Sequence, residues 1–293
     1  MSSAMSSAMS PVTDYSPREL RAAAAALAAG RFATDGAARR HTAHGAATPW
    51  RPGSPLVRVT AANNGAGAST IALALADVAS QESQVRLLDA AAPTWSGLVG
   101  ASVTELGGQG GWRRGRRNDR LVIDRLQPHA STPADLPVPR GHEPVSLTVL
   151  DVGWTRRELT AHPHGWWNSV ETAESVVDVV VTRASAAAFG QAEAALEQAA
   201  LENADLDACV LVVVGANRWS GSAFASAGHR MRRLRATGSI TFVPHLGARA
   251  LSGLGPEPLP RLLLSSAQRL LERITTITGP LPATRVRPVK EKS

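Results

Sequence analysis

The sequence predicts an α/β fold in which a mostly parallel central sheet carries helices on both faces, giving three layers. Runs of valine and leucine alternate with helical stretches from residue 55 onward, and this alternation is typical of parallel strands buried on both faces. A glycine-rich turn separates the first apolar run from the first helical stretch. The chain has 293 residues, 44% of them hydrophobic, which is enough for a sizeable core.

The individual elements follow from this alternation. Each predicted strand is a short run rich in β-branched residues that ends at polar residues or glycine, and together these are residues 55–62, 84–90, 120–126, 145–153, 175–183, 207–216 and 239–244. The predicted helices are residues 69–81, 185–202, 221–236 and 259–275. The arginine-rich stretch 104–119 is predicted to be a loop inserted before the third strand.

Changes in composition suggest where the domain begins and ends. Residues 55–277 are expected to form one domain. Residues 1–54 show little periodicity and are predicted to be a mostly disordered arm that could contain one alanine-rich helix over 16–32. Residues 278–293 are basic and rich in proline, and are predicted to be a disordered tail.

Charge and cysteine usage exclude several kinds of site. The net charge is +7, and the only lysines are Lys290 and Lys292 in the tail, so no lysine of the predicted domain can contact a phosphate. Cys209 is the single cysteine, which excludes an intramolecular disulfide and fits a cytoplasmic protein. No apolar run is long enough to span a bilayer. The abundance of arginine and alanine suggests a GC-rich, actinobacterial genome.

The stretch "AANNGAGAST", residues 61–70, predicts an anion site between a strand and a helix. The first N–H groups of such a helix face the ligand together with the positive end of the helix dipole. One interpretation is a dinucleotide loop, G-x-G-x-x-G, in which Gly65 and Gly67 match but Thr70 holds the third position. Asp89 then lies where a ribose-binding acid belongs. An NAD(P)-dependent dehydrogenase therefore remains an alternative.

The second interpretation is a P-loop, and here the order of several motifs is informative. Residues 63–70 align with K-G-G-x-G-K-[ST]-[ST], "VRLLDAAAP" with a strand that ends in D-x-D-P, and "VSLTVLDVG" with a Walker B strand. "AESVVDVVVTRA", "VLVVVGANR" and "FVPHLGARALSGLGPEP" follow in the matching order. The chain thus resembles the ParA/MinD family of deviant Walker ATPases, within the SIMIBI class. This resemblance covers about residues 55–277 and implies a P-loop NTPase-like fold.

The resemblance also implies which residues would contact a nucleotide. The phosphate and adenine contacts carried over from the family are Gly65, Gly67, Ala68, Ser69, Thr70 and Asn217. The magnesium ligands carried over are Ser69, Asp89 and Asp151. The implied ligand is ATP or ADP with Mg²⁺, bound weakly and not required.

Three positions depart from the family in the groups closest to hydrolysis. Ala68 replaces the P-loop lysine, Asn63 replaces the signature lysine that reaches the partner's nucleotide, and Ala91 replaces the second aspartate of D-x-D-P. Phosphoryl transfer depends mainly on positioned charge, and one such cation contributes about 10³–10⁵ in rate. The degenerate Walker A motif therefore predicts a pseudo-ATPase with no catalytic residue.

Two arginine clusters are candidate contacts for nucleic acid or a partner protein. They are Arg113, Arg114, Arg116 and Arg117 in "GWRRGRRNDR", and Arg230 and Arg233 in "HRMRRLR". Arginine suits phosphate backbones because its guanidinium can form two hydrogen bonds in one plane. A solvated basic loop, or a contact with an acidic protein, is an equally good interpretation.

Taken together, these features favour a non-hydrolysing ParA/MinD-like scaffold or regulator in plasmid or chromosome partition, conjugation or cell positioning. It would pair with itself or with an active family member. Two alternatives remain open: an active ATPase with unorthodox catalytic residues, and a nucleotide-independent DNA-binding partition factor. Membrane binding is not expected, because the tail has many prolines and little apolar surface.

Overall fold

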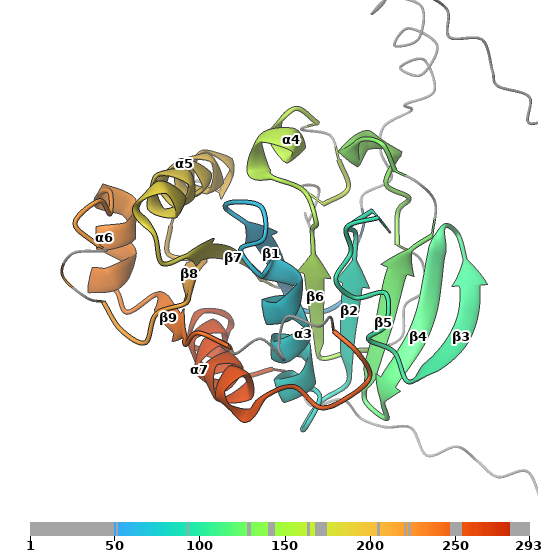
Figure 1. Ribbon diagram of the computed structural model, residues 1–293. Helices are drawn as coiled ribbons and strands as arrows, with labels where there is room; N and C mark the ends of the chain where they lie inside the picture. The colour runs from blue at the N-terminus through green and yellow to red at the C-terminus, as the bar shows by residue number, and fades with distance from the viewer. Residues whose placement is uncertain are drawn as a thin grey trace, which may run out of the picture. The chain divides into compact units, whose positions relative to one another are not determined.

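The computed structural model describes residues 50, 52–92, 94–127, 130–139, 144–162, 165–167, 175–203, 206–219, 221, 224–246 and 254–281. The predicted helix over 16–32, and nearly all of the predicted arm and tail, lie outside the described residues. The described part contains one nine-stranded sheet with helices against both of its faces (Figure 1). The predicted α/β class is confirmed.

The strands follow the order β3-β4-β5-β2-β6-β1-β7-β8-β9 across the sheet. Their bounds are β1 Leu56–Ala61, β2 Val85–Asp89, β3 Thr104–Gln109, β4 Trp112–Asn118, β5 Leu121–Leu126, β6 Leu147–Asp151, β7 Val176–Arg183, β8 Cys209–Val214 and β9 Ile240–Val243. From β5 to β9 every neighbouring pair is parallel, whereas β3 and β4 pair antiparallel at one edge. The sheet is therefore mostly parallel, as predicted.

The position of β1 decides between the two interpretations of the glycine-rich turn. β1 lies between β6 and β7, and β6 separates it from β2. In a dinucleotide-binding fold the first two strands are neighbours in the sheet. The dehydrogenase alternative is therefore wrong at the level of the fold.

Helices cover the two faces of the sheet unequally. Helices α3 (Ala68–Ala79) and α7 (Arg261–Thr278) contact each other and pack on one face. On the other face, α5 (Ala186–Asn203) and α6 (His229–Ala236) pack against β7 and β8, and the short α4 (Arg156–Thr160) contacts α5. A cluster that includes five buried tryptophans covers the rest of that face, and these are Trp50, Trp112, Trp154, Trp166 and Trp167.

Three sequence-based expectations are corrected. Residues 104–118, predicted as part of a loop, form the hairpin β3–β4, whose strands have no apolar run and in which three of the four arginines pair with carboxylates. The helix predicted over 221–236 begins only at His229, because Gly228 is extended and sits against Glu193. Trp50 was assigned to the arm, yet it is 3% exposed within the tryptophan cluster.

In the part of the chain that the structure describes, no helix combines sufficient length with sufficient apolar character to span a membrane.

Candidate functional site

The phosphate loop connects β1 to α3 at the carboxyl edge of the sheet (Figure 1). Gly65 and Gly67 have positive φ angles, 68° and 98°, which disfavour any residue with a Cβ. A Cβ on either would meet nothing within 4 Å, so the space above the loop is open. No side chain caps the N-terminus of α3. The first N–H groups of the helix are thus available to an anion.

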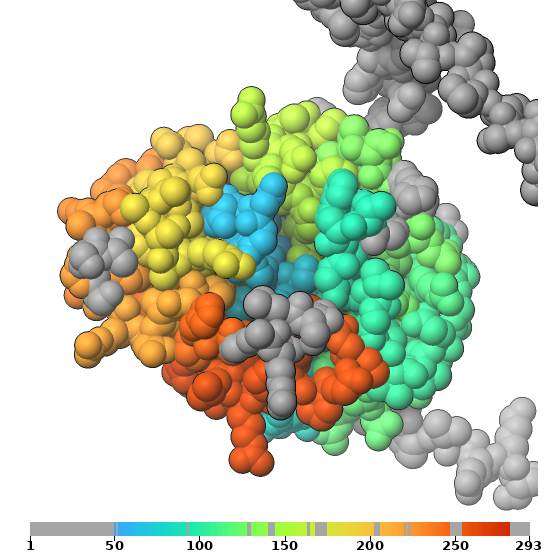
Figure 2. All heavy atoms as spheres, viewed as in Figure 1, coloured from blue at the N-terminus to red at the C-terminus, as the bar shows by residue number. Residues whose placement is uncertain are grey.

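A cavity of about 940 Å³ lies above this loop, and we call it the loop cavity. Figure 2 shows a hollow on this face, between the early part of the chain in blue and the segment after β2 in teal. The predicted residues that line it are Gly65, Gly67, Ala68, Ser69, Thr70 and Asp151. Other residues of the lining include Ala91, Trp95, Trp154, Arg157, Glu158 and Arg183. Asn217 and Asp89 are not part of the lining.

Asp151 ends β6 and forms part of the wall of the loop cavity. It is completely buried, and neither carboxylate oxygen has a hydrogen bond of normal geometry with any described residue. Burial raises its pKa to about 6, while the nearby Ser69 hydroxyl and the Gly153 N–H lower it in part. Burying a carboxylate without a cation is costly, so this carboxylate is suited to a cation that enters the cavity with a ligand.

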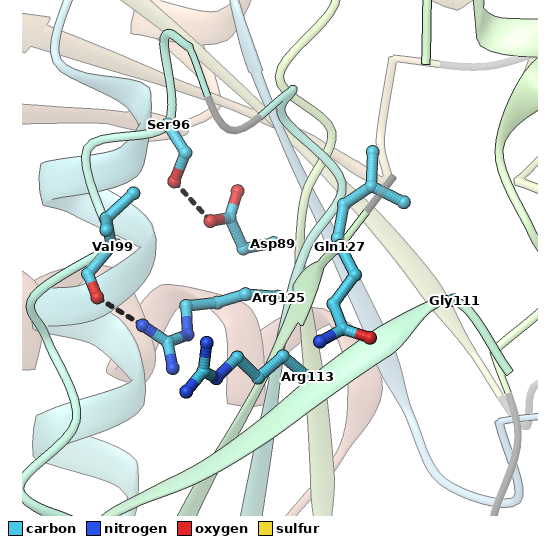
Figure 3. Close-up of a pocket in the computed structure, with 8 residues that line it drawn as sticks. Asp89, Ser96, Val99, Gly111, Arg113, Arg125 and Gln127 are labelled. Carbon is cyan, nitrogen blue, oxygen red and sulfur yellow. Dashed lines mark hydrogen bonds between the residues drawn. The ribbon is translucent and has the colours of Figure 1, made fainter. Parts of the chain in front are cut away.

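Asp89 is adjacent to Asp151 but belongs to a different cavity. The two residues pair across β2 and β6, yet Asp89 lines a second pocket that faces the β3–β4 hairpin (Figure 3). Its Oδ1 accepts from the Ala91 N–H at 3.1 Å and its Oδ2 accepts from the Ser96 hydroxyl. Burial and the neighbouring Asp151 raise its pKa to about 8. The two acids therefore lie side by side at the ends of adjacent strands although they line different cavities, and a metal site that they share stays a prediction.

Two arginines that sequence analysis missed lie in the loop cavity. Arg157 is in α4 and Arg183 ends β7, next to β1 in the sheet. The Arg183 Nε donates to the Gly65 carbonyl at 2.8 Å. A usable signal existed for Arg183, because parallel strands end at a common edge and 175–183 was a predicted strand. No comparable signal existed for Arg157.

The structure shows the surroundings of the three positions at which the sequence departs from the family pattern. Ala68 lies at the cavity wall and offers no charge. The Asn63 side chain is occupied inside the chain, since its Nδ2 donates to the Asn64 carbonyl at 3.2 Å and its Oδ1 accepts from Thr182 at 3.4 Å. Ala91 backs onto Gly153, where an added Cβ would lie 2.3 Å from its Cα. These positions provide neither a cation nor a group that orients water.

The arginines of the first cluster are largely paired with carboxylates. Arg113 pairs with Glu105, Arg114 with Asp124 and Arg117 with Asp77. Within the described part of the chain, no ion pair is found for the exposed Arg116. In the second cluster, Arg230 contacts Glu193 and Glu197, and Arg233 contacts Asp207. Contact of these residues with nucleic acid or a partner stays a prediction. Because most of them pair with carboxylates, the uncompensated positive charge of the two clusters is smaller than the sequence suggested.

The loop cavity has the size and the polar groups that a phosphate-bearing ligand requires. Its volume is in the range of small-molecule sites, roughly 300–1,000 Å³. The open glycines and the α3 N-terminus suit phosphate oxygens, and Arg157 and Arg183 are the nearby cations. Ser69 and Asp151 offer oxygen ligands of the kind that Mg²⁺ accepts alongside phosphate groups. The arrangement can thus hold an anion, and Ala68 and Ala91 line the cavity where the family pattern has a lysine and an aspartate.

Comparisons with known proteins give similarity in structure only. No protein-family model matches the sequence, and a search of curated proteins found no match. A putative plasmid partition protein from Borrelia burgdorferi, bound to AMPPNP, is 11% identical with a TM-score of 0.49, over 76% of this chain and 98% of that chain. The MinC:MinD cell division complex of Aquifex aeolicus is 13% identical with a TM-score of 0.46, over 79% of this chain and 99% of that chain.

McdA from Cyanthece, without ligand, gives 13% identity and a TM-score of 0.46, over 77% of this chain and 99% of that chain. The order of the strands and the loop that follows β1 describe the fold independently of these values. The chain is similar in fold to ParA/MinD-type ATPases, the family that the order of its sequence motifs resembles.

Proposed function

We propose that this chain is a ParA/MinD-like protein that holds a nucleotide at the loop cavity without hydrolysing it, and that it acts as a scaffold or regulator in partition or cell positioning. The observation that carries the first part is the fully buried carboxylate of Asp151, which lines the same cavity as an open glycine loop. The partition or positioning role rests on the resemblance of the motif order.

Each residue of the cavity would have a defined role in holding the ligand. The N–H groups at the start of α3 would bind phosphate oxygens, and Arg183, anchored on the Gly65 carbonyl, would supply positive charge beside them. Mg²⁺, when bound with a nucleotide, would screen the phosphate charge, with Ser69 and Asp151 as its protein ligands. Ala91 has no side-chain group to orient a water molecule, which supports binding without turnover.

The binding step can be tested by titrating ATP with Mg²⁺ into the full chain by calorimetry, with a parallel assay of phosphate release. We expect weak binding, no release above background, and an affinity reduced about tenfold or more by Arg183→Gln, since one charge-assisted contact contributes roughly 1.5–3 kcal/mol. Arg218→Gln is the matched control, because Arg218 is exposed and does not line the cavity. An equal loss in both variants would reject the assigned site.

An active ATPase is the second candidate, and the presence of Arg157 and Arg183 in the cavity favours it. An arginine can stabilise the charge of a phosphoryl-transfer transition state, as arginine fingers do. This candidate predicts phosphate release that Asp151→Asn and one of the two arginine variants abolish. Release that survives all three substitutions would point to a contaminating enzyme.

The scaffold part needs a separate experiment, because a scaffold is defined by what it holds. We propose a homodimer, or a heterodimer with an active family member, as the functional unit. Light scattering of the purified chain with and without ATP tests self-association, and co-purification from the native host tests the heterodimer. A monomer that recovers no relative would contradict this part and leave nucleotide binding unaffected.

A further inference from the structure

The second pocket, which we call the hairpin pocket, is formed between the β3–β4 hairpin and the segment after β2. Its volume is about 530 Å³ and its lining includes Val99, Arg113, Arg125, Leu126 and Gln127 (Figure 3). This volume also lies within the range of roughly 300–1,000 Å³ that small-molecule sites occupy. The proposed function does not use this pocket, although its lining includes Asp89 and Arg113, which the sequence analysis assigned to other roles.

Two arginines lie side by side in it. Arg113 of β4 and Arg125 of β5 are directly opposite each other in the antiparallel register, and their guanidinium groups are close together in Figure 3. Like charges in directly opposite positions are unfavourable unless an anion compensates them. The pair therefore creates a local requirement for negative charge.

Glu105 of β3 meets this requirement only in part. Its carboxylate bridges the two guanidinium groups, with the Arg113 Nε at 2.9 Å and the Arg125 Nη2 on its other oxygen. One carboxylate thus serves two cations. The side chain of Glu105 is 40% exposed, so an external anion can replace it without opening the core.

A buried donor in the pocket also lacks a partner. Arg125 is 8% exposed, its Nη1 donates to the Val99 carbonyl, and its Nε is buried without a hydrogen bond to any described residue. The other carboxylate of the pocket, Asp89, has both oxygens engaged by Ser96 and Ala91. The guanidinium of Arg125 thus has donor capacity that its contacts within the described chain do not use, and a bound acceptor can use it if the side chain shifts.

We propose that the hairpin pocket binds a small organic anion whose carboxylate or phosphate group is held between Arg113 and Arg125. Val99 and Leu126 contact the apolar part of this ligand. Glu105 acts as an internal competitor that occupies the guanidinium groups when the ligand is absent. This site is separate from the loop cavity and does not depend on nucleotide binding there.

The test titrates the full chain with succinate and, separately, with inorganic phosphate, so that the two arms distinguish a carboxylate ligand from a phosphate ligand. We expect binding of at least one probe, weakened about tenfold or more by Arg113→Gln. Arg116→Gln is the matched control, since it removes the same charge from the same strand. Glu105→Gln is expected to tighten binding, because it removes the competing charge and leaves the size of the side chain unchanged.

Thermal melting confirms that each variant is folded, and if Arg113→Gln is not, Glu105→Gln decides. Tighter binding by Glu105→Gln supports the proposal, and unchanged or weaker binding overturns it. Equal losses in Arg113→Gln and Arg116→Gln, or no binding of either probe, would also overturn it. Loss of binding in Arg183→Gln would assign the anion to the loop cavity instead, so failure here is distinguishable from failure of the proposed function.

Discussion

Both carboxylate oxygens of Asp151 lie inside the protein, at the wall of the loop cavity, without a hydrogen bond of normal geometry to any described residue. Asp89 lies beside it on the neighbouring strand and accepts two hydrogen bonds. Although these two residues are of the same type, their different partners give them different chemistry. Asp151 lies at the wall of the loop cavity, whereas Asp89 accepts hydrogen bonds from the segment that follows β2.

The raised pKa values predict how stability depends on pH. Because burial raises the pKa of Asp151 to about 6 and that of Asp89 to about 8, the folded protein keeps protons that the unfolded chain has lost. This stabilisation is present below about pH 4 and is lost as pH rises towards 8. We expect the free energy of unfolding, measured with urea, to fall from pH 5 to pH 8. Asp151→Asn should reduce this fall, and an unchanged or steeper fall in the variant would contradict the assignment.

The missing lysine gives a second prediction at the residue scale. Ala68→Lys would place an ammonium group at the wall of the loop cavity, where it can meet a phosphate. We expect ATP affinity to rise about tenfold or more, with no phosphate release, because Ala91 still leaves the water unpositioned. Ala68→Met is the control, since it adds a similar stem without the charge. Turnover by Ala68→Lys alone would show that the charge was the only missing element.

At the scale of secondary structure elements, strand β4 of the β3–β4 hairpin carries two neighbouring arginines that differ in burial and in contacts. Arg117 is buried and ties β4 to α3 through Asp77, with a bond of 2.7 Å. It also donates to the carbonyls of Ala101, Gly255 and Glu257. Arg116, its neighbour, is exposed. Arg117 therefore ties elements of the fold together. Because it is buried, it leaves only the other arginines of the first cluster as candidate contacts for nucleic acid or a partner protein.

This difference predicts a large gap between two adjacent substitutions. Arg117→Met leaves Asp77 and three carbonyls without their donor, and we expect it to lower the free energy of unfolding by about 3–5 kcal/mol. Arg116→Met should change it by less than about 0.5 kcal/mol. Urea denaturation at pH 7 measures both. Similar values for the two variants would mean that Arg117 does not tie the hairpin to α3.

At the scale of the whole molecule, buried charge joins elements that are far apart in the sequence. Asp178 of β7 pairs with Arg58 of β1 and with Arg156 of α4, and all three side chains are at most 6% exposed. Removing one member of such a group leaves an uncompensated charge in the interior, whereas replacing all members by apolar residues is often neutral.

For this group we predict that Asp178→Asn lowers the free energy of unfolding by about 3–5 kcal/mol. The combined variant Arg58→Met, Asp178→Leu and Arg156→Met should recover much of this loss, because no buried charge is left unpaired. Chemical denaturation of both variants provides the measurement. If the combined variant is less stable than Asp178→Asn, the three charged residues add to the free energy of unfolding beyond neutralising one another.

The sequence by itself determined the elements of the parallel sheet, the loop between β1 and α3, and the acids that end β2 and β6. These features depend on local pattern, since apolar periodicity and glycine positions are set by neighbouring residues. The absence of lysine from the predicted domain and the substitutions at Asn63, Ala68 and Ala91 were equally visible. The β3–β4 hairpin was missed because its strands lack an apolar run.

Only the tertiary structure decided what lies together around these elements. The strand order excluded a dinucleotide-binding fold and brought Arg183 beside β1, and the packing of α4 brought Arg157 to the loop cavity. These neighbours depend on which strands pair and on how the helices pack, and a short stretch of sequence does not reveal either. In the same way, the sequence predicted a basic loop, whereas in the hairpin three of its arginines form ion pairs with Asp77, Glu105 and Asp124.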